Sequence, residues 1–200
     1  MDTHEIISVV IRTIGRPTLA DAIESAKKEF KNVIVVADAV DLDFNSLPKD
    51  VLYLRTGMQH DKYGSAALNM GAYACSTPYF CLLDDDDSFV PGAGNIMISK
   101  VLSEPSVDIW IPGLNFNNGM QLCMSPERGV VMGNVAVPTY KTKLLFLLPF
   151  YKGLEGPNAD YIDFHHIEVL NKLGAKIKWY GELLYNVRPN LEGTNGRGNL

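Results

Sequence analysis

Four consecutive aspartates, Asp84 to Asp87, are the residues whose type and spacing point most directly to chemistry. They follow the apolar run 79–83, which is short enough to be a strand buried on both faces, as in a parallel sheet. Ligands of open α/β sheets collect at the carboxyl ends of such strands. Adjacent carboxylates repel one another, and Mg²⁺ or Mn²⁺, completed by substrate phosphates, is the natural compensating cation. The alternative is a solvated acidic turn, which the buried-strand context disfavours.

The composition sets limits on the class of protein. A chain of 200 residues, 46% of them hydrophobic, suits one domain with a full core. Without a membrane-length apolar run or a signal-peptide pattern, we expect a cytoplasmic protein, of the producing cell or of a virus-infected host. The net charge of −5 argues against nucleic acid as a partner. Cys75, Cys81 and Cys123 lack CxxC spacing and are expected to be buried thiols.

The elements that must position the aspartates follow a β-α-β rhythm. The apolar periodicity predicts strands over 6–11, 32–36, 51–54 and 79–83, with helices over 19–30 and 65–74. The second helix consists of small residues, which let a backbone or ligand approach closely. This rhythm predicts a parallel sheet with right-handed crossovers.

The second half of the chain is less regular. Residues 112–133 show little periodicity, and we expect a long insertion there that is functional or mobile. The other predicted elements are a helix from Pro91 to about 103, strands over 107–111, 134–137, 177–180 and 183–187, a short helix over 141–148, and a helix from about 159 with Ile162, His166, Val169 and Leu173 on its inward face. We find no internal repeat and no second domain.

Five segments, taken in order, resemble motifs of one enzyme family. They are the first strand with Arg16-Pro17, Val35 to Asp38, Gly64 to Gly71, Leu83 to Asp87, and Ala159 to Tyr161 before an amphipathic helix. Together they resemble the inverting, family-2-type glycosyltransferases of the GT-A fold. The resemblance covers about residues 6–188 and implies a single α/β domain with a mixed, mostly parallel central sheet flanked by helices. It further implies a nucleotide-sugar-binding half (1–104), an acceptor-binding half (105–188) and a flexible tail (189–200).

The sequence departs from the family pattern at three positions. Ala37 stands where the first of two acids often lies, so recognition of the base rests on Asp38 alone. Leu68 replaces a frequent arginine, and Ala159 replaces the usual glutamate beside the catalytic aspartate.

The resemblance implies transfer of a sugar from a nucleotide sugar, preferably a UDP-sugar, to an acceptor hydroxyl, with Mn²⁺ or Mg²⁺ on the diphosphate. Asp86 is then the expected metal ligand. Asp84 is a second ligand or faces the ribose, since alternate residues leaving a strand point in different directions. Asp160 is the expected general base, because the first turn of a helix favours a carboxylate; the alternative is that it only caps that helix. Direct attack by the acceptor would invert the anomeric centre.

The remaining candidate residues surround these acids. The nucleotide-sugar-binding set is Ile11, Arg12, Thr13, Asp38, Gly64, Asn69, Asp84 and Asp85. Further candidates are Asp163 as an alternative base, His165 and His166, Arg188 over the diphosphate, and Arg16 and Lys62 near phosphates. The two histidines face about 100° apart on a helix and cannot chelate one ion together, so a buried, hydrogen-bonded histidine is the alternative. Trp110 and Trp179 either stack on a sugar or belong to the core.

Three other classes share some of these features. A dinucleotide dehydrogenase would carry Gly-x-Gly-x-x-Gly after the first strand, whereas residues 11–18 contain a single glycine. A nucleotidyltransferase usually has a glycine-rich, cationic loop there, and residues 12–17 match this only in part, with two arginines and a single glycine. A non-catalytic sugar-nucleotide-binding protein would keep the pocket and lose the base. The expected partners are a nucleotide-sugar donor and a glycan or other hydroxyl acceptor, with no nucleic acid and no membrane span. The chain is either one domain of a longer polypeptide or a compact enzyme.

Overall fold

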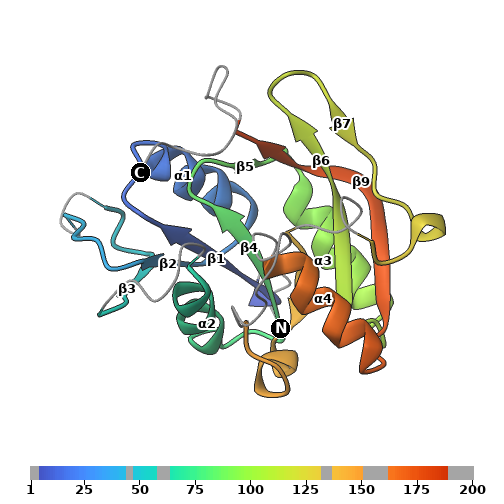
Figure 1. The fold of residues 1–200 in the computed structure, drawn as a ribbon. Helices are drawn as coiled ribbons and strands as arrows, with labels where there is room; N and C mark the ends of the chain where they lie inside the picture. Colours follow the sequence, from blue (N-terminus) through green and yellow to red (C-terminus); the bar gives the residue numbers. More distant parts are fainter. Residues whose placement is uncertain (1–4, 44–46, 58–63, 132–136, 151–161, 189–200) are drawn as a thin grey trace.

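The computed structural model describes residues 5–43, 47–57, 64–131, 137–150 and 162–188 (Figure 1). Within these ranges nine strands form one mixed sheet flanked by helices, which confirms the expected α/β class. In chain order the elements are β1 (Ile7–Thr13), α1 (Leu19–Glu29), β2 (Asn32–Ala37), β3 (Leu52–Arg55), α2 (Ser65–Tyr73), β4 (Tyr79–Asp84), β5 (Ser88–Phe89), α3 (Ala93–Ser103), β6 (Ile109–Phe116), β7 (Gln121–Leu122), the 3₁₀ helix η3 (Pro126–Arg128), β8 (Thr139–Lys141), the 3₁₀ helix η4 (Thr142–Phe146), α4 (Ile162–Lys172) and β9 (Ile177–Val187).

The sheet has the strand order β3-β2-β1-β4-β8-β6-β9-β5, and β7 pairs with the end of β6. The strand β1 is parallel to β2 and β4, and β2 is parallel to β3, so the predicted parallel beginning is confirmed. The β-branched, apolar sequences of β1 and β2 suit strands that are buried on both faces. The strand β8 runs antiparallel between β4 and β6, whereas β6 and β9 are parallel.

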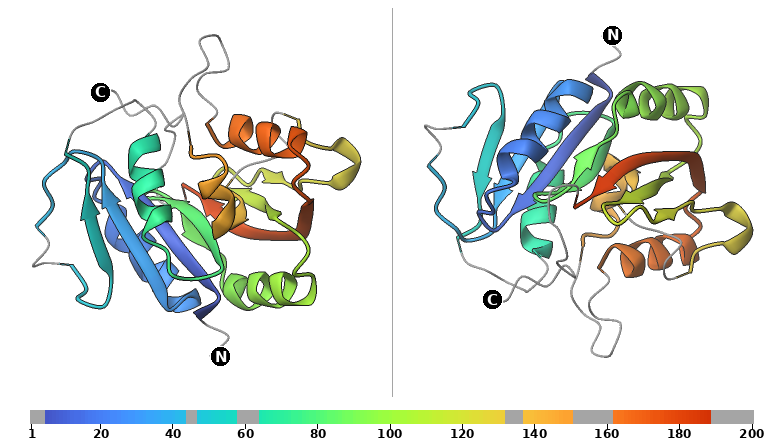
Figure 2. Two further views of the ribbon diagram at one scale, coloured as in Figure 1. Left: turned by 90° about the horizontal axis from the view of Figure 1, so that it is seen from below. Right: turned by 90° about the horizontal axis from the view of Figure 1, so that it is seen from above.

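Helices cover both faces of the sheet, with α1 and α3 on one side and α2 and α4 on the other (Figure 2). The carboxylate of Glu29, at the end of α1, accepts hydrogen bonds of 2.9 Å from the backbone N–H groups of Gly92 and Gly94. It thereby satisfies donors at the beginning of α3, which have no partner within the helix. In the described ranges, no helix has both the length and the hydrophobicity that a membrane crossing requires.

Residues 112–131 are more regular than the sequence predicted. The strand β6 continues to Phe116, β7 pairs back on it, and η3 follows. The expectation of one irregular insertion was therefore wrong for this part, while residues 132 and 133 lie outside the described ranges. The prediction failed because Pro112, which lacks an N–H group, marks the end of a strand in many sequences.

A bulge lets the sheet continue past Pro112. Ile111 pairs with Trp179 and Gly113 with Leu183, so the register shifts where the proline lies. Gly181 has a φ of +87°, which glycine adopts without strain. The two strands predicted over 177–180 and 183–187 are consequently one strand, β9, with this irregularity in its middle.

The segment after residue 136 also differs from the prediction. The strand predicted over 134–137 falls mostly outside the described residues, and Val137, with a φ of 37°, is not in a strand. The strand β8 begins two residues later, and the helix predicted over 141–148 is the five-residue 3₁₀ helix η4.

The buried stripe of α4 is rotated from the predicted one. His166, Ile167 and Leu170 are buried, whereas Val169 and Leu173 are 38% and 69% exposed. Both stripes are apolar at helical spacing, so the pattern alone could not separate them.

The three cysteines are free thiols. Cys81 is buried and Cys75 is half-buried, and burial raises the pKa of the Cys75 thiol to about 12. Cys123 is exposed, so the expectation of burial was wrong for this residue.

The small-residue helix α2 packs closely on the sheet at Gly71. A Cβ atom at this position would lie 2.4 Å from Cγ1 of Val10 and 3.0 Å from Cγ2 of Val36. Both valines are fully buried in β1 and β2, so neither can move aside freely. The close approach that the sequence predicted for this helix is therefore made by valine side chains of the sheet.

We expect the substitution Gly71→Ala to destabilise the protein. Overpacking costs about 1–3 kcal/mol, and the gain in helix propensity returns only about 1 kcal/mol, so the net loss should approach about 2 kcal/mol. The measurement is urea unfolding followed by circular dichroism. Gly57→Ala is the control, because a Cβ there would have no heavy atom within 4 Å. Equal stability of the two variants would contradict this description of the packing.

Candidate active site

Three parallel strands end at one edge of the sheet and bring the predicted residues together. Arg12 in β1 pairs with Asp84 in β4, and Thr13 pairs with Ala37 in β2. Asp38, which follows β2, donates its backbone N–H to the carbonyl oxygen of Thr13. The candidate residues of these strands, far apart in the sequence, therefore share the carboxyl edge where ligands of such sheets bind.

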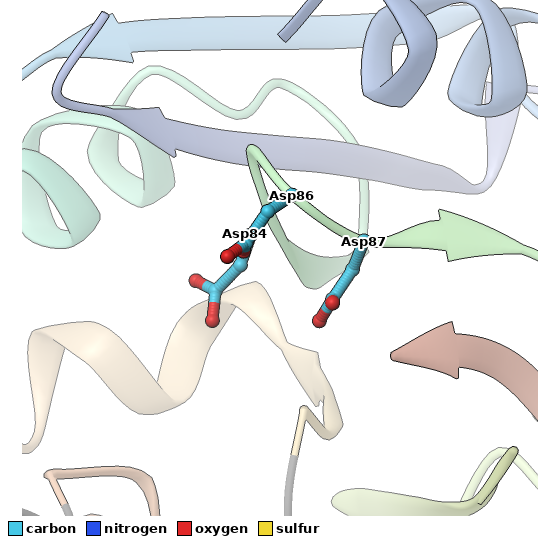
Figure 3. Close-up of side chains that lie close together, drawn as sticks. All are labelled: Asp84, Asp86 and Asp87. Atoms are coloured by element: carbon cyan, nitrogen blue, oxygen red, sulfur yellow. The ribbon is translucent and has the colours of Figure 1, made fainter. Parts of the chain in front are cut away.

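The chain turns sharply within the aspartates. The N–H of Asp87 donates to the carbonyl oxygen of Asp84 at 3.1 Å, which closes a four-residue turn. Asp84, Asp86 and Asp87 each bring one carboxylate oxygen within 4.8 Å of the others (Figure 3). These three residues are called the aspartate cluster below. Of its members, Asp87 was not among the predicted ligands, because its direction depends on the turn.

Asp85 is separated from the cluster by its hydrogen bonds. Its carboxylate accepts from the hydroxyl of Thr13 at 2.5 Å, from the N–H of Ile14 at 3.3 Å and from Arg16 at 2.5 Å. The residue is 1% exposed. Asp85 and Thr13, both predicted to contact the nucleotide sugar, thus hold the loop after β1 against the aspartate turn.

Three arginines surround the aspartate cluster. Arg12 Nε lies 2.7 Å from Asp84 Oδ1, and Arg16 Nη1 lies 3.6 Å from Asp86 Oδ1. Arg188, at the end of β9, places its Nε 3.8 Å from Asp86 Oδ2 and donates its backbone N–H to Asp87 at 2.7 Å. Its φ of 52° is unusual for a residue other than glycine. Arg188, singled out from its position in the sequence, is therefore beside the acids.

The pKa values of the three carboxyls are driven apart by their surroundings. Burial, together with the charge of Asp84, raises the pKa of Asp86 and raises that of Asp87 well above its ordinary value. Burial acts in the same direction on Asp84, but the charge and hydrogen bond of Arg12 lower its pKa. A group of close carboxylates that is costly to ionise fits a hard divalent cation with oxygen ligands, which would favour the ionised form of each.

A second group of residues lies beside the cluster. Asp38 is buried and accepts a hydrogen bond of 3.1 Å from the hydroxyl of Thr56. Gly64, with a φ of 68°, has Cδ of Arg12 and Oδ2 of Asp38 each 3.4 Å from where its Cβ would be. The sequence analysis did not include Thr56 among the site residues. Its position directly after β3 would have indicated it, because the ends of the parallel strands meet at this edge. Ile11 is fully buried in β1.

Other predicted residues contact other parts of the protein and not the aspartate cluster. Trp110 is buried and stacks on Tyr180 with ring centroids 5.2 Å apart, and the half-buried Trp179 packs against the same core. The side-chain amide of Asn69 is hydrogen-bonded to the backbone of Phe150. His165 Nδ1 lies 3.6 Å from a carboxylate oxygen of Glu168 on the same helix.

His166 is held by two hydrogen bonds in the core. Its Nε2 is 2.9 Å from the carbonyl oxygen of Leu148, and its Nδ1 is 3.2 Å from the hydroxyl of Tyr140. Because a carbonyl oxygen can only accept, Nε2 carries a proton. Burial lowers the pKa of His166 and so favours the neutral ring, in which Nδ1 accepts from the tyrosine hydroxyl.

We therefore expect the contribution of His166 to the free energy of unfolding to fall as the pH is lowered. The unfolded chain has a histidine pKa of about 6.5, above that of His166 in the folded protein, so it takes up the proton first. The stabilising effect of the neutral ring is complete above that value and is lost below it. Relative to His166→Gln, the wild type should become less stable when the pH is lowered from about 7.5 to about 5.5. Urea unfolding at both pH values measures it, and an unchanged difference would contradict the prediction.

Three predicted residues are not covered by this geometry. Asp160 and Lys62 lie outside the described residues. Asp163 belongs to α4, but its side chain is not described.

The comparisons with known proteins support the fold. No family model matches the sequence, and no curated protein matches it. Among solved structures, S. aureus TarS 1–349 matches with a TM-score of 0.71 at 15% identity, over 91% of this chain and 60% of that chain. The complex of TarS 1–349 with UDP matches with a TM-score of 0.68 at 16% identity, over 91% of this chain and 60% of that chain. Its complex with UDP-GlcNAc matches with a TM-score of 0.68 at 14% identity, over 91% of this chain and 58% of that chain. The chain thus spans about three fifths of TarS 1–349 and shares its fold.

Proposed function

We propose that this protein transfers a sugar from a nucleoside diphosphate sugar to an acceptor hydroxyl, with Mg²⁺ or Mn²⁺ on the diphosphate. The observation that carries the proposal is the aspartate cluster, three oxygens within 4.8 Å, beside Arg12 and the buried Asp38 at the ligand-binding edge of the sheet. The fold shared with TarS, whose structures include complexes with UDP and UDP-GlcNAc, supports a nucleotide sugar as the donor.

The aspartate cluster suits the diphosphate end of such a donor. Asp86 and Asp84, with Asp87 as a third candidate, would hold the divalent cation, which neutralises the charge that develops on the leaving diphosphate. Arg188 lies beside Asp86 and Asp87 and can add a positive charge on the same side. The arginines do not replace the cation in this proposal, because Arg12 and Arg16 are already paired with Asp84 and Asp85.

The neighbouring residues suit the nucleoside. A carboxylate accepts hydrogen bonds, and the ring N–H of uracil is a donor that matches Asp38. Thr56 orients that carboxylate through its 3.1 Å hydrogen bond, and the absent side chain of Gly64 leaves room next to it. We therefore propose UDP as the nucleotide, with the sugar lying between the nucleoside group and the acceptor side of the sheet.

Asp160 is the proposed general base, on the basis of the sequence motif. It would take the proton of the acceptor hydroxyl as that oxygen attacks the anomeric carbon, while the diphosphate leaves from the opposite side. One displacement without a covalent intermediate inverts the anomeric centre. Asp163, three residues further along the chain, is the alternative base.

Calorimetry with UDP tests the proposal without knowledge of the sugar or acceptor. UDP should bind in the presence of Mn²⁺ or Mg²⁺, and EDTA should abolish most of the binding. A thermal-shift screen of nucleotide sugars with Mn²⁺ would then identify base and sugar together. Absence of binding for every nucleoside diphosphate, or equal binding with EDTA, would overturn the proposed function.

A further inference from the structure

Asp87 joins the turn of the aspartates to the end of β9. Its carboxylate accepts a hydrogen bond of 2.7 Å from the backbone N–H of Arg188, the residue that follows β9. Asp87 is 7% exposed, so this bond is largely shielded from water. Figure 3 shows the side chain of Asp87 on the side of the cluster where β9 ends. The bond connects two parts of the candidate site that lie 101 residues apart in the sequence.

The pairing of β5 with β9 explains why a side chain makes this bond. At the end of β5, the N–H of Val90 donates to the carbonyl oxygen of Leu184 at 3.0 Å. Hydrogen-bonded pairs recur at every second residue of an antiparallel ladder, so the same register would bring Arg188 opposite the backbone of Asp86. The chain instead turns within the aspartates, and the carboxylate of Asp87 supplies the acceptor for the N–H of Arg188.

This bond also holds Arg188 in an uncommon backbone conformation. Its φ is 52°, a value that residues with a Cβ atom rarely adopt. Such a conformation persists where surrounding contacts offset its cost, and the bond to Asp87 is such a contact.

The backbone of Arg188 determines where its guanidinium lies. The Nε atom is 3.8 Å from Oδ2 of Asp86, which is an ion-pair distance but too long for a hydrogen bond. The attraction to Asp86 therefore fixes the guanidinium less firmly than the bond to Asp87 fixes the backbone.

We infer that Asp87 is a positioning residue for Arg188 and, through Arg188, for the diphosphate of the donor. The carboxylate holds the backbone of Arg188, and the guanidinium is thereby kept beside Asp86, where the diphosphate is proposed to bind. This inference rests on the proposed function. It differs from the role of a third metal ligand, because it requires a hydrogen-bond acceptor at position 87 and no negative charge.

The decisive comparison is between Asp87→Asn and Asp87→Ala. The amide oxygen of asparagine can still accept from the N–H of Arg188, so the Kd of UDP with Mn²⁺ should stay within about twofold of wild type. Alanine has no acceptor, and we expect the Kd to rise about 10-fold, the effect of misplacing one hydrogen bond to a charged group. A third metal ligand would instead lose affinity in both variants, because the cation prefers a carboxylate.

Arg188→Ala tests whether the effect of Asp87 passes through the arginine. This variant should also weaken the binding of UDP about 10-fold. The double variant Asp87→Ala/Arg188→Ala should bind UDP as Arg188→Ala does, because nothing is left for Asp87 to position. Lys31→Ala is the matched control and should keep the wild-type Kd. It removes a positive charge from a surface pair with Glu5, at the opposite edge of the sheet, where β1 and β2 begin.

Amide hydrogen exchange, measured without UDP or metal, gives an independent readout. The N–H of Arg188 should be protected in the wild type and in Asp87→Asn, and should exchange at least about 10-fold faster in Asp87→Ala. An unprotected amide in the wild type would overturn the inference, and this measurement remains decisive if Asp87→Ala does not fold.

The binding assay can also overturn the inference. Equal weakening in Asp87→Asn and Asp87→Ala would make the charge of Asp87 the important property. Wild-type affinity in Asp87→Ala or in Arg188→Ala would remove the positioning role, as would a double variant in which the two losses multiply. Failure of the proposed function is recognised separately, because the wild type would then bind no nucleoside diphosphate while the amide of Arg188 stays protected.

Discussion

Metal-dependent binding of UDP is expected to weaken by about 100-fold or more when Asp86 is replaced by asparagine. Altering residues that only orient metal ligands already costs about 10- to 100-fold in affinity, and Asp86 is proposed as a ligand itself. The substitution also removes one negative charge from a cluster whose other oxygens lie within 4.8 Å. Calorimetric titration of UDP with Mn²⁺, with and without EDTA, measures the effect.

Loss of binding in Asp86→Asn should not be accompanied by loss of stability. Burial and the charge of Asp84 raise the pKa of Asp86, which means that the ionised form is unfavourable in the fold without a cation. A neutral side chain of the same shape should therefore leave the melting temperature equal or higher. Asp50→Asn is the matched control, because it removes the same charge from a surface pair with Lys27. If Asp86→Asn binds UDP and Mn²⁺ as tightly as Asp50→Asn does, the metal assignment is wrong.

Asp160→Asn should abolish most of the sugar transfer while leaving the donor bound. A positioned general base contributes about 10²- to 10⁴-fold to the rate, so kcat should fall by that factor. Asparagine cannot take the proton of the acceptor hydroxyl, but it removes nothing from the aspartate cluster or from the group around Asp38. The Kd of UDP with Mn²⁺ should therefore stay within about twofold of wild type.

Asp163→Asn distinguishes the two carboxylates proposed for this step. A large loss of kcat in Asp160→Asn, with a small one in Asp163→Asn, supports the assignment. The reverse result would assign the base to Asp163, three residues further along the chain, and full turnover in both variants would remove general-base catalysis by either residue. Each variant requires the UDP titration as a control for folding.

Part of this site could be predicted from local sequence alone. An apolar run that ends in aspartates indicates a buried strand with acids at its carboxyl end, and β4 has this structure. The β-branched runs that form β1 and β2 predicted a parallel sheet in the same way, because a strand that is buried on both faces has a continuous apolar sequence. Where the pattern was ambiguous, as for the stripe of α4 or the strand through Pro112, the predictions were wrong.

The direction of each acid was decided only by the tertiary structure. Strand alternation does not separate Asp85 from Asp87, yet Asp85 turns to Thr13, 72 residues away, while Asp87 joins the cluster. Asn69 likewise finds Phe150 across 81 residues. Local sequence determines which segments become buried strands, since that depends on the hydrophobicity of a few adjacent residues. Which polar side chains face a ligand depends on partners that the fold brings from elsewhere, because a buried polar group must find its hydrogen bonds wherever they are available.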